Sequence, residues 1–396
     1  MQNILDYLDW RGDISFEKDG FNEVDNLILS TLSYLDYGGI IPEMVEEDAV
    51  TLSEIIDRVV DSVDENSVNY QNPFFKPIPD LFIKVAQSVR FGDVRISCYV
   101  NQVDHEHWAQ FSAVVFSFHK EKHYVAFRGT DDTLAGWKED FLMSFMDEVQ
   151  AQRDAVDYLK YIVPYFDGEL YLGGHSKGGN LAVYAASYME ETVRKRIPVI
   201  YNNDGPGFQG SFLKNVGYKN ILSRISTIIP KSSIVGLLFE HREGYTIVNS
   251  DEKGIMQHNV FSWEVKGTHF VYHEQLEKSS IHFNKALRLW LKKLPLLERS
   301  QFVDALFNII YASGAMTISE LTVERLAAVE GMIKSYKNLE PETKKFLKKT
   351  IRAFFRERQK VLRYSVGMDI NLLLSRKKEK AEPEEVAAKE KTEHDS

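Results

Sequence analysis

A serine flanked by glycines stands between a short apolar run and a long run of small and apolar residues. Residues 170–172 lead into Gly174-His175-Ser176-Lys177-Gly178, and residues 179–186 follow without a proline. This order is typical of a nucleophile elbow, which consists of a strand, a sharp turn and a helix, with the serine at the tip of the turn. We call the helix that follows the turn the elbow helix. Glycines suit such a turn because its backbone is strained and bulky side chains would clash. The pattern predicts Ser176 as a nucleophile, with the backbone N–H of Lys177, at the helix start, as an oxyanion donor.

A serine nucleophile needs a histidine base, which in α/β hydrolases follows both the serine and the acid along the chain. His258 lies in a loop after the apolar strand predicted at residues 245–248, and this position favours it as the base. His241 is the main alternative, and a purely local role for His258 in its loop stays open. The other downstream histidines lie at or inside the helical region or in the last residues: His269, His273, His282 and His394.

The acid that orients the histidine is predicted to be Asp204. This residue directly follows the strand predicted after the elbow helix, and carboxylates at the C-terminal ends of strands can reach the site crevice. The surrounding Asn-Asp-Gly-Pro sequence is also strong turn chemistry, so a role only in the turn remains an alternative. Residues 230–239, after the next strand, contain no carboxylate, and Asp251 is too close to His258 in the sequence to be favoured.

A second oxyanion donor is expected in the loop after an early strand. Residues 127–130, Phe-Arg-Gly-Thr, supply such a loop. Gly129 allows the backbone to approach a ligand closely, and Thr130 offers an N–H and a hydroxyl. We expect Trp137 and Asp140, which follow this loop, to have a structural role in pinning it.

The elements that must position these residues alternate between strands and helices. The N-terminal third is predicted to be mostly helical, with helices at 24–35, 51–63 and 78–88. Residues 95–100 and 111–118 are expected to form a hairpin, and 260–265 a strand that closes the sheet. The remaining strands are predicted at 123–127, 198–201, 225–229 and 245–248, with helices at 136–145 and 149–163. Strands separated by helices predict an α/β fold with a mainly parallel central sheet covered by helices on both faces.

Composition limits the classes of function. The chain has 396 residues and a formal charge of −10, which argues against a general nucleic-acid binder. Cys98 is the single cysteine, so no intrachain disulfide forms, and no Cys/His cluster predicts a metal site. We find neither a signal-peptide pattern at the start nor the roughly 20 apolar residues of a membrane span, so a cytoplasmic protein without metal or organic cofactor is expected.

Four regions are predicted along the chain. They are an N-terminal helical extension at 1–90, a hydrolase core at 91–273, a C-terminal helical region at 274–376 and a charged disordered tail at 377–396. The boundary near residue 274 rests on the loss of strand patterns, and the tail on a Lys-, Glu- and Ala-rich composition with almost no large apolar residues.

Three short motifs in the sequence together resemble those of the class 3 lipases. The motifs are residues 127–130 (F-R-G-T), 136–140 (G-W-K-E-D) and 174–179 (G-H-S-K-G-G). The chain is still more similar to an uncharacterised bacterial branch of lipase-like α/β hydrolases, grouped as a domain of unknown function. That similarity includes residues 10–13, 21–25, 204–208 and 257–263.

The resemblance implies an α/β-hydrolase fold with Ser176 as nucleophile, His258 as base, and Thr130 and Lys177 as oxyanion donors. One departure concerns the acid, because class 3 lipases usually carry an aspartate in an N-D-x-V-P-like stretch. The matching residues 231–235 have serine there, so Asp204 would supply the acid from one strand earlier.

A basic helix is predicted near the C-terminus. The stretch from Glu342 to Arg363 carries nine Lys or Arg residues against two Glu. Leu347, Ile351, Phe354 and Phe355 are predicted to share one helical face. Such a helix can lie on an anionic membrane surface, or its apolar face can dock on the rest of the chain.

These patterns together predict a serine hydrolase of lipase or esterase type that cleaves acyl esters or lipids through an acyl-enzyme on Ser176. The alternative is a weakly active or inactive hydrolase-like protein that binds an acyl ligand, a protein partner or a membrane surface, because a fold alone does not guarantee activity.

Overall fold

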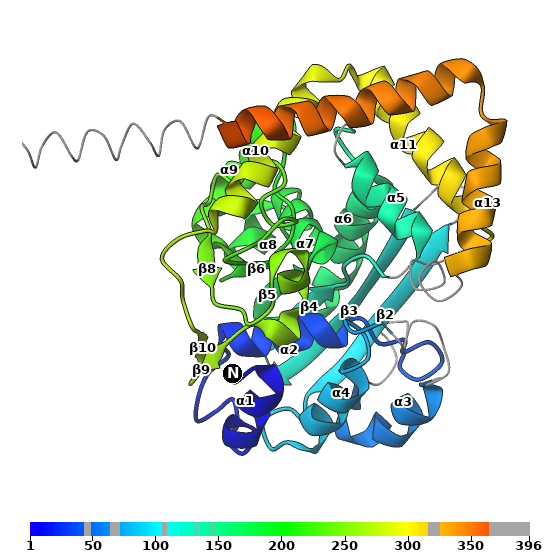
Figure 1. Ribbon diagram of the computed structural model, residues 1–396. Helices are drawn as coiled ribbons and strands as arrows, with labels where there is room; N and C mark the ends of the chain where they lie inside the picture. Colours follow the sequence, from blue (N-terminus) through cyan, green and yellow to red (C-terminus); the bar gives the residue numbers. More distant parts are fainter. Residues whose placement is uncertain are drawn as a thin grey trace, which may run out of the picture.

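One sheet forms the centre of the molecule. Figure 1 shows the computed structural model, which describes residues 1–42, 49–63, 72–104, 109–119, 121–131, 133–143, 146–315 and 325–363. Eight strands within these residues lie along the sheet in their order along the chain. They are β1 (Val50–Thr51), β2 (Arg95–Asp104), β3 (Ala109–His119), β4 (Lys122–Phe127), β5 (Glu169–His175), β6 (Ile200–Asn203), β7 (Ile225–Pro230) and β8 (Thr246–Val248).

Strand direction changes in the middle of the sheet. Strands β1 to β4 pair antiparallel, and β4 to β8 pair parallel. In the parallel part, the last residue of β5 pairs with the last residue of β6, His175 with Asn203. Ser176 and Asp204, which follow these two residues, therefore leave the sheet at the same edge. The predicted α/β fold with a mainly parallel sheet is confirmed.

Alternating side chains divide the strands between two cores, one on each face of the sheet. Along β4, Tyr124 and Ala126 belong to one buried cluster, and Val125 and Phe127 to the other. The first face is covered by α1 (Ile4–Arg11), α2 (Glu23–Leu32), α3 (Ile56–Ser62) and α4 (Ile78–Gln87). The second face is covered by α6 (Gln150–Ile162), α7 (Lys177–Ser187) and α9 (Val216–Ile221). Helices on both faces leave most residues of β4 to β7 buried, as their apolar runs predict.

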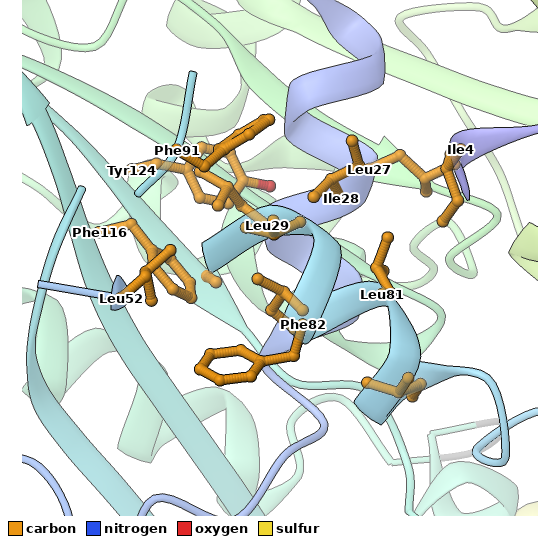
Figure 2. Close-up of a cluster of buried hydrophobic side chains, with 14 of the residues drawn as sticks. Ile4, Leu27, Ile28, Leu29, Leu52, Leu81, Phe82, Phe91, Phe116 and Tyr124 are labelled. Carbon is orange, nitrogen blue, oxygen red and sulfur yellow. The ribbon is translucent and has the colours of Figure 1, made fainter. Parts of the chain in front are cut away.

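The N-terminal helices pack directly on the sheet. Figure 2 shows Leu27, Ile28 and Leu29 of α2 among side chains of α4 and the strands, including Phe82 and Phe116. The Asn22 side chain accepts hydrogen bonds from the N–H groups of Val24 and Asp25 and thereby caps the start of this helix. Polar contacts also hold α2 against the strands that precede Ser176 and Asp204.

The polar contacts of α2 reach the two strands that precede Ser176 and Asp204. Asn26 donates to the amide oxygen of Asn203, 3.0 Å away, and accepts from the Tyr124 hydroxyl at 2.7 Å. Asn203 in turn donates to the carbonyl oxygen of Gly174 at 3.1 Å. All of these side chains are buried. Because buried polar groups are costly unless paired, this network holds α2, β5 and β6 in one arrangement.

The C-terminal region contains only helices within its described residues. They are α10 (Lys278–Lys293), α11 (Leu296–Tyr311), α13 (Arg325–Asn338) and a helix over residues 341–363. The last helix runs across the top of Figure 1, where it packs against α10 and α11. Trp290 of α10 donates its indole N–H to the Thr350 carbonyl at 3.0 Å, and its ring contacts Phe354. No helix in the described part of the chain is long and apolar enough to cross a membrane.

The smaller elements complete the described structure. They are α5 (Leu134–Leu142), α8 (Glu191–Lys195), the 3₁₀ helices η1 (Ser53–Ile55), η3 (Val163–Tyr165), η4 (Phe212–Lys214), η5 (Leu222–Arg224), η6 (Gly254–His258) and η7 (Val260–Ser262), and strands β9 (Val265–Lys266) and β10 (His269–Phe270).

Three local predictions need correction or lie outside the described residues. The strand predicted at 260–265 is wrong, because η7 occupies its first half and β9 pairs with β10, in a separate two-stranded sheet. The helix predicted at 51–63 begins at Ile56, because β1 pairs with β2 first. The tail predicted at 377–396 lies outside the described residues, and the four predicted boundaries stay predictions.

The basic helix has two separate apolar stripes. Leu347 and Val361 are buried, and Phe354 packs between Phe283 and Trp290, so docking of an apolar face on the chain is confirmed. Ile351 and Phe355, which were expected on the same face, are 44% and 52% exposed. The single-face prediction is therefore wrong, because the docked stripe is narrower than the apolar surface of this helix.

Candidate active site

The backbone at Ser176 has the conformation expected of a strained turn. Ser176 lies between β5 and α7 with φ 58° and ψ −133°, a region that residues other than glycine rarely adopt. The backbone segments approach closely at this turn, since a Cβ on Gly178 would lie 2.0 Å from the carbonyl oxygen of Phe127. Only a glycine there lets α7 start so close to β4. The Ser176 side chain is thereby presented above the edge of the sheet, at the wall of a cavity.

His258 and Asp204 are hydrogen bonded although they are 54 residues apart. The Nδ1–H of His258 donates to Oδ2 of Asp204 at 2.6 Å. The other Asp204 oxygen accepts from the Ser233 hydroxyl at 2.5 Å and from the Gly236 N–H at 3.1 Å. Asp204 is fully buried, and these donors provide hydrogen bonds to both of its oxygens. The carboxylate therefore fixes the tautomer in which the Nε2 of His258 is free to accept a proton.

The loop that carries His258 is held by its neighbour Gln257. Its buried side-chain oxygen accepts from the Ser232 N–H at 2.7 Å, and its backbone carbonyl oxygen accepts from the indole N–H of Trp263 at 2.8 Å. His258 is at the end of η6, and its side chain is 23% exposed. His258 and Ser176 line the same cavity, and among the described residues they form no hydrogen bond with one another. Such contacts often tighten only when substrate binds.

His175, directly before the serine, positions the His258 segment, and sequence reasoning missed it. Its Nε2 lies 3.0 Å from the carbonyl oxygen of His258, and its Nδ1 lies 3.0 Å from the Tyr34 hydroxyl. Burial lowers the pKa of His175 well below its usual value, so the ring is neutral. The Nε2–H therefore donates to His258, and Tyr34 donates to Nδ1. The signal for this residue was its place beside Ser176, but its partner Tyr34 comes from a distant N-terminal segment.

The loop at residues 128–131 lies against the elbow. A Cβ on Gly129 would lie 2.4 Å from the carbonyl oxygen of His175 and 3.1 Å from the Cβ of Ser176, so only glycine allows this approach. Thr130, the next residue, lines the cavity beside Ser176 and donates its hydroxyl to Asp140 at 2.6 Å. Asp140 therefore holds the threonine side chain, in line with the expected pinning role, and Trp137 also lines the cavity.

The Lys177 side chain is occupied by structural contacts. Its Nζ lies 2.7 Å from a Glu139 carboxylate oxygen and 3.0 Å from the Gln110 carbonyl oxygen, and both charged groups are buried. The backbone N–H of Lys177 is at the first position of α7, where a helix provides no internal partner. This N–H and the positive end of the helix dipole lie next to Ser176, as an oxyanion donor requires.

Asp140 gives a stability prediction. Burial raises the pKa of Asp140 to about 6, against the opposing effects of Lys177 and the Thr130 hydroxyl. The native protein thus binds this proton more tightly than the unfolded chain, so the stabilisation is complete below the unfolded pKa of 3.8 and is lost as pH rises through 6. Asp140→Asn removes this titration. In urea unfolding, we expect the variant to gain on the order of 1–3 kcal/mol relative to the original protein between pH 5 and pH 8. If the difference in free energy of unfolding between the variant and the original protein is the same at pH 5 and at pH 8, this raised pKa is wrong.

A cavity of about 500 Å³ surrounds the serine and is mostly apolar. Its roof comes from the C-terminal helices, with Phe283, Leu287, Trp290 and Leu291 of α10 and Phe302 and Val303 of α11. Its volume is in the range of small-molecule sites. Sequence reasoning gave these helices no role at the site, because their amphipathic pattern does not say what they cover. In the described part of the chain, no group of three or more His, Cys, Asp or Glu is arranged to hold a metal ion.

Comparison with known proteins gives one family and two distant structures. The Mbeg1-like family model matches residues 85–308. Among solved structures, M37 lipase is similar at 13% identity and a TM-score of 0.33, covering 54% of this chain and 68% of that chain. A fungal lipase–inhibitor complex is similar at 16% identity and a TM-score of 0.29, with 51% and 81% covered. No curated protein matches significantly. The family model spans more than half of the sequence, so the chain belongs to the Mbeg1-like family.

Proposed function

We propose that this protein is a serine hydrolase that cleaves carboxylic acyl esters through an acyl-enzyme on Ser176. The observation that carries the proposal is the hydrogen bond between buried Asp204 and His258, which lines the same cavity as Ser176. A histidine held by a buried carboxylate next to a serine on a strained turn is the arrangement that activates a hydroxyl.

Each proposed chemical step uses a group already described. His258 Nε2 takes the proton of the Ser176 hydroxyl while the serine oxygen attacks the acyl carbonyl carbon. The backbone N–H groups of Thr130 and Lys177 stabilise the negative oxygen that forms. His258 then gives its proton to the leaving alcohol, which leaves an acyl-serine. Water loses a proton to His258, attacks the acyl carbon and releases the acid, and the serine regains its proton.

The cavity supports an acyl group as the recognised part of the substrate. Apart from the catalytic groups, most of its lining consists of aromatic and aliphatic side chains from the loops and the roof helices α10 and α11. An alkyl chain gains free energy when it leaves water for such a lining. A substrate with a highly charged acyl part would lose its hydration there without compensation.

A fluorophosphonate probe tests the proposal directly, because it phosphonylates only an activated serine. We expect the original protein to be labelled and the Ser176→Ala variant to be unlabelled. If the folded original protein is not labelled at all, the alternative of a ligand-binding, inactive hydrolase-like protein replaces this proposal.

The roof gives a prediction about acyl-chain length. Leu287→Trp adds volume to the cavity wall formed by α10, so long acyl chains should fit less well than short ones. We expect kcat/KM for a dodecanoyl ester to fall about 10-fold, and that for an acetyl ester about 2-fold or less. The matched control is Leu297→Trp, at a position on α11 that is 70% exposed, and it should change neither value. Equal losses for both esters would argue against the roof as the acyl site.

We also propose peripheral membrane contact through the helix at residues 341–363. Its exposed stripe, Ile351, Phe355 and Leu362, is flanked by lysine and arginine side chains. In sedimentation with vesicles containing phosphatidylglycerol, Ile351→Ser with Phe355→Ser should reduce the bound fraction several-fold. Equal sedimentation of the variant and the original protein would remove this helix from consideration.

A further inference from the structure

A second hollow lies on the other side of α10 from the serine cavity. It has a volume of about 550 Å³, and its lining includes four cationic side chains, those of Arg242, Lys285, Arg288 and Lys292. Glu240 is the single carboxylate among its lining residues, and it pairs with Arg288 at 2.9 Å. Within the described residues, no carboxylate lies at ion-pair distance from the other three cations. This hollow is thus strongly positive on a chain with a formal charge of −10.

A buried imidazole in the wall of the hollow has one nitrogen without a partner. The His241 side chain is 4% exposed, and its Nδ1 lies 3.0 Å from a Glu243 carboxylate oxygen. Glu243 also accepts hydrogen bonds from the Thr227 and Tyr218 hydroxyls, at 2.8 and 2.7 Å. The Nε2 of His241 is buried and has no hydrogen-bond partner among the described residues. An unpaired buried polar atom is costly, and this one belongs to a residue that lines the hollow.

A strained residue separates the hollow from the serine cavity. Phe239 lines both spaces, and its φ of 65° lies in the left-handed region that a phenylalanine rarely adopts. The conformation is held by two hydrogen bonds between Phe208 and Glu240, each 2.9 Å. Strain of this kind persists only where the surroundings enforce it, and it is concentrated at functional sites. Asn284 of α10 donates to the Leu237 carbonyl oxygen and ties the helix to this loop.

We propose that this hollow is a binding site for a phosphate group, carried by a soluble phosphate ester or by a lipid head group. Several cations around one space suit a compact anion with several acceptor oxygens. Arginine and lysine bind phosphate through charge-assisted hydrogen bonds, and His241, whose Nε2 is unpaired, lines the same hollow. The site is distinct from the proposed triad, and its occupancy does not depend on hydrolysis.

The test measures binding to the full chain carrying Ser176→Ala, so that hydrolysis plays no part. Calorimetry measures the binding of two soluble probes, inorganic phosphate and glycerol 3-phosphate. Sedimentation measures binding to phosphatidylcholine vesicles with or without phosphatidylglycerol. Arg242→Gln with Lys285→Gln removes two exposed cations of the hollow. Lys195→Gln with Lys214→Gln removes two exposed cations elsewhere and is the matched control. Circular dichroism checks that each variant is folded.

The hollow variant should weaken saturable binding about 10-fold or more, and the control about 2-fold or less. Such a loss for the soluble probes identifies a soluble phosphate ester as the ligand class. A loss confined to phosphatidylglycerol vesicles identifies a lipid head group. The proposal is overturned if no probe binds saturably, or if the hollow variant and the control bind equally. His241→Asn gives an independent check, since it should weaken binding without a change of surface charge.

Discussion

Replacing Ser176 by alanine is expected to lower kcat for a short acyl ester by about 10⁴-fold or more. The reason is chemical, since the acyl-enzyme path needs an oxygen at this position and a methyl group cannot replace it. The change should have little effect on folding, because the backbone strain at φ 58° is present with either side chain. Steady-state hydrolysis of a p-nitrophenyl ester measures the loss, and thermal unfolding verifies the fold.

The matched control for this variant lies at the far end of α7, the helix that follows Ser176. Ser187→Ala removes a buried hydroxyl that donates only to the carbonyl oxygen of Val183, 2.7 Å away. Its kcat should remain within about 2-fold of the original value, at a cost of roughly 1 kcal/mol in stability. Residual activity in Ser176→Ala close to that of this control would mean that another nucleophile carries the reaction.

Replacing Asp204 by asparagine is expected to lower kcat by about 10³–10⁴-fold. Asparagine has nearly the same shape, so the hydrogen bonds from Ser233 and Gly236 can persist at Oδ1. The group facing His258 Nδ1 then carries no negative charge, and it favours the tautomer in which Nε2 holds the proton and cannot act as base. The measurement is kcat against pH, together with fluorophosphonate labelling, which should slow by a similar factor.

Two further variants separate the triad role from a role in the turn. Asp251→Asn changes an exposed carboxylate that is closer to His258 in sequence, and it should leave kcat within about 2-fold of the original. Ser233→Ala removes one donor to Asp204, and we expect an intermediate loss of about 10-fold, because the carboxylate keeps its other partners. If Asp204→Asn unfolds the protein while Ser233→Ala leaves kcat unchanged, Asp204 has only a structural role.

The sequence alone was sufficient wherever the required chemistry is local. The apolar strand, the glycines around Ser176 and the following helix are consecutive in the sequence, so their order and spacing predict the elbow. The same holds for the Gly129-Thr130 loop, where the glycine indicates that the backbone passes close to another part of the chain. Alternating strand and helix patterns were enough for the fold, because burial of a parallel sheet on both faces leaves continuous apolar runs.

Tertiary structure decided the contacts between distant segments. The pairing of β6 with β7 and of β7 with β8 brings Asp204 to His258 across 54 residues, whereas Asp251, which is closer to His258 in the sequence, is exposed. Only packing assigned α10 and α11 to the cavity roof and divided the apolar positions of the 341–363 helix into docked and exposed stripes. The physical reason is that an amphipathic pattern specifies that a helix buries one face, but the shapes of the surrounding elements choose what that face covers.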